Sequence, residues 1–143
     1  SLDTMFVSEI FIMAHSIGSV MAALINEIYS DKIHTLDVVN PAYDLHNIEK
    51  DTVKNAIHNN PEFLKDFNIR NCKMFDVSPF HFHLGRNDYS FDFNKKLARS
   101  TYRDITEYDF EHRFNEEEWK ILFANVYKKY IDLEKEIRCY GLD

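Results

Sequence analysis

The sequence predicts an α/β protein in which a mostly parallel sheet of about four strands is flanked by helices. Short apolar segments alternate with helical segments along the whole chain, and this alternation is typical of a parallel sheet. The length of 143 residues corresponds to about one domain, so we expect a single domain over 1–143. Glycine occurs only three times, where average usage predicts roughly ten. Glycine-rich phosphate loops and flexible linkers are therefore excluded.

The first part of the chain predicts two strands around an apolar helix. Residues 9–14 and 33–39 are short runs rich in strand-forming residues. Residues 17–29 between them have the apolar spacing of a helix, and the alanines on its other side indicate a central, well-covered element. The residues expected to form its buried face are Ile17, Val20, Met21, Leu24, Ile25 and Ile28.

Residues 41–78 are the least regular part and form a possible cap or insertion. A helix is expected at about 49–59, and Pro61 can start another. Aromatic residues of this region could line an acyl pocket, or they could simply pack the cap itself. These aromatic residues are Phe63, Phe67 and Phe75, with Phe80 just beyond.

The last part of the chain predicts two more strands, each followed by a helix. The strands are expected at 80–84 and 104–109, and the first of the two helices at 91–100. The final helix has the clearest signals, because Asn115 can cap it and three glutamates follow at its positive end. Gly141 is placed to stop it. Its expected buried stripe is Trp119, Leu122, Phe123, Val126, Tyr130, Leu133 and Ile137.

Charge and cysteine content narrow the possible partners and location. The net charge of −7 argues against a general affinity for nucleic acid or for anionic membranes. Cys72 and Cys139 cannot form a disulfide framework and match no zinc motif. No apolar run reaches the roughly 18 residues that a membrane span needs, and no signal peptide is recognisable. We therefore expect a soluble protein of the cytoplasm.

The first strand-to-helix junction has the pattern of a nucleophile elbow. In Ala14-His15-Ser16-Ile17-Gly18, a serine lies at a sharp turn between small residues two positions away on each side. Such a turn presents the hydroxyl above the sheet and aims the next amide, that of Ile17, at a developing oxyanion. The alternative is that Ser16 only caps the helix and Gly18 permits close packing.

A serine nucleophile needs a base and a group that orients the base, and both are present in the expected order. Asp88 follows the third predicted strand, after a tight turn at Gly85, and His112 follows the fourth. The carboxyl ends of parallel strands meet at one edge of a sheet. Ser16, Asp88 and His112 are therefore expected to lie close together.

These motifs resemble those of the α/β-hydrolase superfamily, particularly its small bacterial esterases and lipase-like hydrolases. The match covers roughly residues 9–135, the carboxyl-terminal portion of that fold, and extends to Val39-Asn40-Pro41-Ala42 at the end of the second strand. The resemblance implies a truncated three-layer sandwich and hydrolysis of a carboxylic ester or thioester without a cofactor or metal. It makes Ser16 the nucleophile, Asp88 the orienting acid and His112 the general base. His15 and Tyr89 are expected next to the substrate, and a packing role is the equal alternative for His15.

Two departures from the family pattern matter. Ala14 replaces the first glycine of the elbow, and only eight residues precede the first predicted strand. The family's earlier strands, one of which carries the second oxyanion donor, are not in this sequence. We expect an incomplete sheet whose exposed edge is covered by a second copy of the chain, as a homodimer.

Two other functions stay open. A non-catalytic α/β module with a relic triad could act through dimerisation or partner binding. His81 and His83 lie two apart on a predicted strand, so their side chains share one face, as metal ligands would. No clear third ligand accompanies them in the sequence.

Overall fold

The computed structural model describes residues 10–29, 31–45, 51–59, 62 and 80–139. The chain divides into two compact units, and the boundary between them along the sequence falls between His112 and Arg113. The first unit contains the sheet and every candidate catalytic residue, and the second contains one long helix. The expected helix after Pro61 and the aromatic residues Phe63, Phe67 and Phe75 lie outside the described residues.

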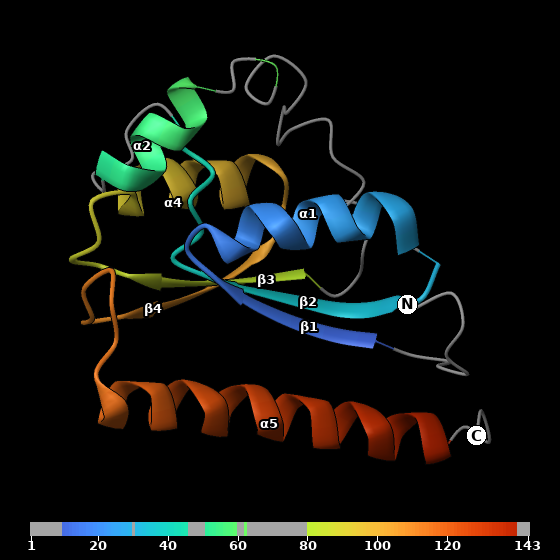
Figure 1. Ribbon diagram of the computed structural model, residues 1–143. Helices are drawn as coiled ribbons and strands as arrows, with labels where there is room; N and C mark the ends of the chain where they lie inside the picture. Colours follow the sequence, from blue (N-terminus) through green and yellow to red (C-terminus); the bar gives the residue numbers. More distant parts are fainter. Residues whose placement is uncertain (1–9, 30, 46–50, 60–61, 63–79, 140–143) are drawn as a thin grey trace. The chain divides into compact units, whose positions relative to one another are not determined.

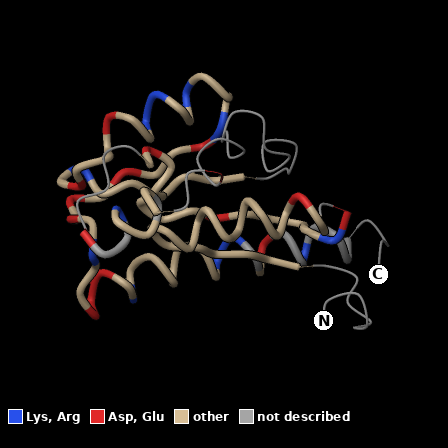
Figure 2. Tube along the Cα trace, turned by 45° about the horizontal axis from the view of Figure 1, so that its top comes forward, with Lys and Arg blue, Asp and Glu red and all other residues tan. Residues whose placement is uncertain are grey.

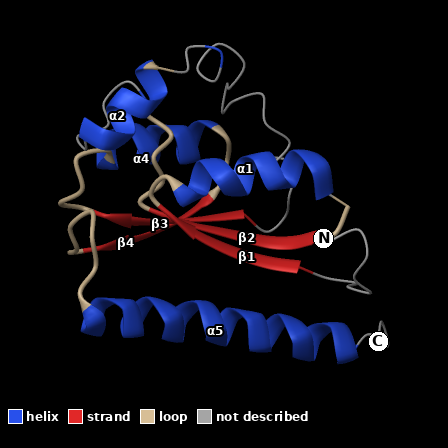
Figure 3. Cartoon of the chain, in the orientation of Figure 1, coloured by secondary structure: helices blue, strands red, loops and turns tan. Residues whose placement is uncertain are grey.

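The first unit is built on a four-stranded, all-parallel sheet in which the strands follow their sequence order. The strands are β1 (Ile10–His15), β2 (Ile33–Val39), β3 (Phe80–Gly85) and β4 (Asp104–Tyr108). The α/β class and the four strands are thus confirmed (Figure 3). Among the strands of the described residues, β1 and β4 stand at the two ends of this order.

Two helices of the first unit pack on the sheet, namely α1 (Gly18–Tyr29) on β1 and β2 and α4 (Phe91–Ser100) on β3 and β4. They lie on the same face (Figure 1). That placement follows from right-handed crossovers between strands that succeed one another in order. A third helix, α2 (Asp51–His58), falls in the expected place between β2 and β3.

The core lies between the sheet and this helical layer. Its strand residues alternate, so that every second side chain of a strand faces the helices. From the strands it takes Leu36, Val38, Phe80, Phe82 and Leu84, and from the helices Val20, Ala22, Ala23, Leu97 and Ala98.

The buried face of α1 differs from the expected one. Val20, Ala22 and Ala23 pack into the core, whereas Met21 and Ile28 are 57% and 70% exposed. Small side chains let the helix approach the sheet closely, and the larger apolar residues of α1 then point away from it. The helix carries apolar residues on both sides and only one charge, at Glu27 (Figure 2), so its periodicity did not identify the buried face.

The contact between α4 and β4 includes an ion pair at the surface. Lys95 Nζ lies 2.8 Å from Glu107 Oε1. The hydrogen bond from Lys95 holds the pKa of the Glu107 carboxyl below its ordinary value.

The second unit is formed by α5 (Glu116–Cys139), which begins at the expected cap. The Asn115 Oδ1 accepts from the Glu118 N–H at 2.9 Å, and Glu118 Oε1 accepts from the Asn115 N–H at 2.8 Å. These reciprocal bonds form a capping box. Of the expected buried stripe, Leu122 and Val126 are buried, but Phe123 is 48% exposed and stacks on Trp119. No helix among the described residues is long and apolar enough to cross a membrane.

Gly85, at the end of β3, and Gly18, at the start of α1, differ in the space around them. A Cβ at Gly85 would collide with the Phe110 carbonyl oxygen and lie 2.9 Å from the Glu111 carbonyl oxygen, whereas a Cβ at Gly18 would meet nothing within 4 Å. Gly85 is therefore required for the close approach of the loop after β4. The interpretation that Gly18 must be small is wrong for this structure, because the turn leaves room beside it.

Gly85→Ala should therefore lower the free energy of unfolding by about 1–3 kcal/mol, since backbone must shift to admit the methyl group. The matched Gly18→Ala should leave stability unchanged or raise it by up to about 1 kcal/mol, because alanine is the better helix former. Urea denaturation of both variants measures the difference. Equal destabilisation by the two substitutions would contradict this assignment.

Candidate active site

Ser16 lies in the turn between β1 and α1 with a left-handed backbone, at φ 54°. Few residues other than glycine adopt this conformation, and it costs on the order of 1–3 kcal/mol. Hydrogen bonds hold the strained turn to the end of β2, because the Ser16 N–H donates to the Val39 carbonyl and the Ala42 N–H donates to the Ser16 carbonyl, both at 3.0 Å. The strand-turn-helix expected at Ser16 is thus present.

The serine hydroxyl meets a histidine that is far away in sequence. Ser16 Oγ lies 2.8 Å from His112 Nε2. His112 follows β4, so the parallel sheet brings together residues separated by 96 positions. At this distance the imidazole can accept the hydroxyl proton directly.

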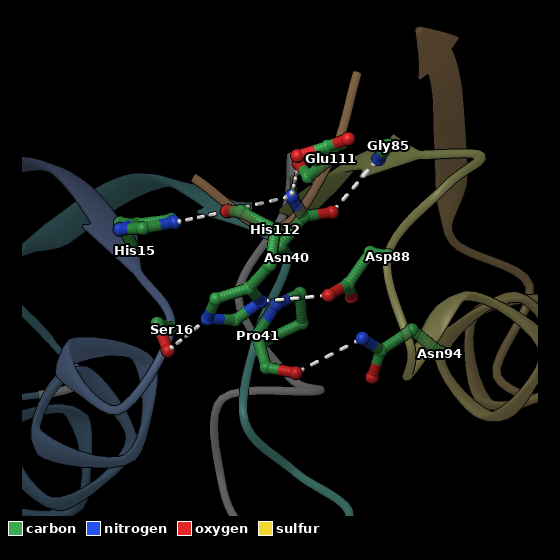
Figure 4. A network of polar contacts seen from close by, with 9 residues as sticks. All are labelled: His15, Ser16, Asn40, Pro41, Gly85, Asp88, Asn94, Glu111 and His112. Carbon is green, nitrogen blue, oxygen red and sulfur yellow. Dashed lines mark hydrogen bonds and ion pairs between the residues drawn. The ribbon is translucent and has the colours of Figure 1, made fainter. Parts of the chain in front are cut away.

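The other nitrogen of the His112 ring meets a carboxylate. His112 Nδ1 lies 2.7 Å from Asp88 Oδ1, and the side chain of Asp88 is fully buried while that of His112 is 23% exposed. An Nδ1–H that donates to Asp88 leaves Nε2 free to accept from Ser16, which is the tautomer that a general base needs. Serine, histidine and aspartate thus form one continuous hydrogen-bonded chain (Figure 4).

Asp88 is placed by the turn that follows β3. Its N–H donates to the Gly85 carbonyl, and its own carbonyl accepts from the Phe91 N–H at the start of α4. Its second carboxylate oxygen, Oδ2, is buried without a hydrogen-bond partner in the described part of the chain. The carboxylate is therefore held mainly by its backbone and by His112.

Three further residues expected at the site surround this chain of hydrogen bonds. His15 donates from Nε2 to the His112 carbonyl at 2.8 Å, so it holds the histidine loop. The Tyr89 ring lies beside the imidazole, with centroids 5.0 Å apart, and is 38% exposed. Ile17 begins the turn into α1, where the first N–H groups of a helix have no intrahelical acceptor. Its amide, next to Ser16, therefore belongs to those that the helix itself leaves without an acceptor.

Asn40 is the residue of this site to which the sequence assigned no role. It is fully buried and has a left-handed backbone at φ 41°, which asparagine tolerates better than most residues. Its Nδ2 donates to the carbonyls of Glu111 and His112, at 3.0 and 3.1 Å. Its Oδ1 accepts from the Gly85 N–H at 2.7 Å. One side chain thereby ties the end of β2 to the acid loop and to the histidine loop (Figure 4).

A second buried asparagine continues this network toward α4. Asn94 is fully buried, and its Nδ2 donates to the Pro41 carbonyl at 2.9 Å. In the sequence, the Asn40-Pro41 dipeptide at the end of a strand is the signal for an unusual backbone conformation at Asn40. This signal does not show which loops the Asn40 side chain bonds to.

On the face of the sheet opposite α1 and α4, Asp37 of β2 lies next to the two histidines of β3 and is a third potential metal ligand. Ligand atoms of Asp37, His81 and His83 all lie within 4.8 Å of one another. This group is separate from the serine, histidine and aspartate described above.

Comparison with known proteins adds no assignment. The chain matches no model of a known protein family, and no curated protein matches it either. What can be said of its chemistry therefore comes from its own residues.

Asn40→Asp should release the histidine loop, because the carboxylate keeps the acceptor for Gly85 but places negative charge against two carbonyl oxygens. Leaving buried groups unsatisfied typically costs about 1–3 kcal/mol each, so the free energy of unfolding should fall by about 2 kcal/mol or more. Asn55→Asp, on the exposed surface of α2, is the matched control. Chemical denaturation in which both variants lose the same stability would contradict the role given to Asn40.

Proposed function

We propose that this chain is a serine hydrolase that cleaves a carboxylic ester or thioester through an acyl-enzyme on Ser16. The observation that supports it is the unbroken set of contacts from Ser16 Oγ to His112 Nε2, at 2.8 Å, and from His112 Nδ1 to Asp88 Oδ1, at 2.7 Å. The strained backbone of Ser16 is the second support. A serine that only capped a helix would need neither the base nor the strain.

The reaction would begin with proton transfer from the Ser16 hydroxyl to His112 Nε2 while Oγ attacks the carbonyl carbon. The tetrahedral intermediate carries a negative oxygen, toward which the Ile17 N–H would donate. Asp88 would stabilise the imidazolium that forms and keep its orientation. His112 would then give the proton to the leaving alcohol or thiol, so that the acyl group stays on Ser16.

Deacylation would reverse these roles with water as the nucleophile. Water within reach of His112 Nε2 would lose its proton to the ring and attack the acyl carbonyl. Collapse of the second intermediate would return the proton to Ser16 and release the carboxylic acid. The Ile17 N–H is the oxyanion donor that the described residues offer next to Ser16, and a donor of this kind is worth about 10²–10³ in kcat.

A fluorophosphonate probe tests the proposal, because it reacts only with an activated serine. The full chain should be labelled with a mass increase of one adduct, and Ser16→Ala should abolish labelling. Ser100→Ala, which changes a serine at the end of α4, should label like the unmodified chain. Lack of labelling of the folded unmodified chain would overturn the proposal, as would equal labelling of Ser16→Ala.

The second candidate function is binding without catalysis, and an exposed apolar row along α1 favours it. The row consists of Ile17, just before α1, and of Met21, Leu24 and Ile28 within the helix, of which Ile28 is 70% exposed. We propose that a second copy of the chain covers this surface. An uncharged row can pair with itself across a twofold axis.

Met21→Lys should therefore convert a dimer into a monomer, since it places a charge in the centre of this surface. Tyr127→Lys, which changes an exposed aromatic residue of α5, should leave the dimer intact. Light scattering coupled to size exclusion measures both. A monomeric unmodified chain, or a dimeric Met21→Lys, would contradict the homodimer.

A further inference from the structure

The polar residues of β2 and β3 form a second cluster on the sheet face opposite α1 and α4. Leu36, Phe80 and Phe82 face the helices, so the residues that alternate with them face the other way. Among these are Asp37, His81 and His83, and Asp37 pairs in register with His81. A carboxylate and two imidazoles thus meet on one face of two neighbouring strands.

The contacts within this cluster are close. His83 Nε2 lies 2.7 Å from Asp37 Oδ1, and the two side chains are 4% and 0% exposed. The rings of His81 and His83 stack nearly parallel, with centroids 4.4 Å apart. The ligand atoms of all three residues fall within 4.8 Å of one another.

We infer that Asp37, His81 and His83 bind one divalent transition-metal ion, for which zinc is the best match. Imidazole nitrogen and carboxylate oxygen are the ligands that zinc accepts at about 2.0–2.2 Å. Ligands around a tetrahedral ion with such bonds lie about 3.3 Å apart. The present 2.7 Å between His83 Nε2 and Asp37 Oδ1 would have to widen by about 0.6 Å. The widest ligand-atom separation, within 4.8 Å, would have to close by up to about 1.5 Å, which rotation of the partly buried His81 side chain can supply. Three protein ligands leave a fourth position open to a small molecule or to water.

The surroundings of the cluster match those of metal-binding histidines. Such a histidine usually binds through one nitrogen and holds a hydrogen bond through the other, which fixes its tautomer. His83 Nδ1 lies 3.0 Å from the Tyr108 hydroxyl, and His81 Nε2 lies 2.6 Å from the Thr106 hydroxyl. The ion would take the place of the proton between His83 Nε2 and Asp37. The His83 Nδ1–H would then donate to the Tyr108 oxygen.

Burial of the carboxylate gives the physical reason for a cation here. An ionised carboxylate removed from water is costly unless it is paired or coordinates a metal. His83 pairs with Asp37 at 2.7 Å. His81, in register with Asp37 and stacked on His83, brings a second imidazole into the cluster, which is what a three-ligand site requires. This inference does not depend on the hydrolase proposal.

Titration with Co²⁺, followed by its visible absorption, tests the site, and competition with Zn²⁺ gives the zinc affinity. The full chain should bind one ion. Asp37→Asn and His81→Gln should each lower the affinity by at least about 100-fold, and Tyr108→Phe by about 10–100-fold. His58→Gln, which removes an exposed histidine of α2, should bind like the unmodified chain.

Two results would overturn the inference. One is that the folded unmodified chain binds no ion. The other is that ions bind equally well to His81→Gln. His81 is only partly buried, so this variant decides the question even if Asp37→Asn does not fold. Circular dichroism confirms the fold of each variant, and fluorophosphonate labelling reports separately on Ser16.

Discussion

The candidate active site depends on the side chain of Asn40. Its three hydrogen bonds join the end of β2 to Gly85 and to the carbonyls of Glu111 and His112. Backbone bonds from Arg86 to Tyr108 and from Asn87 to Phe110 also join the acid loop to the histidine loop. Asn40 adds a fully buried side chain that bonds to both loops at once. Since all strands are parallel, their carboxyl ends lie at one edge, and a single buried amide can reach two of the loops that leave it.

The backbone of the site is also constrained at several positions. Ser16 and Asn40 both have positive φ, at the ends of adjacent strands. Their turns are joined by the bonds from Ser16 to Val39 and from Ala42 to Ser16. Gly85 adds a third constraint, because only a residue without a side chain fits against the Phe110 and Glu111 carbonyls. Strain at the serine is thus sustained by a framework that is dense in hydrogen bonds.

Much of this could be predicted from the sequence, for a definite reason. Strand and helix positions followed from apolar segments and caps, and parallel order then placed Ser16, Asp88 and His112 at one edge. What could not be predicted depends on packing and register. The buried face of α1 was mistaken because both its faces are apolar. The sequence could not show that Asp37 lies beside His81, because this depends on how β2 pairs with β3. It could not show the partners of Asn40 either, because these depend on the positions of two loops.

The central claim is that Ser16 forms an acyl-enzyme, and a burst experiment with p-nitrophenyl acetate tests it most directly. A covalent intermediate that breaks down slowly releases a first equivalent of product quickly. The account predicts a burst of about one p-nitrophenol per chain, followed by slow turnover, and no burst from Ser16→Ala. Product release by the unmodified chain that equals that of Ser16→Ala, with no burst in either, would contradict it.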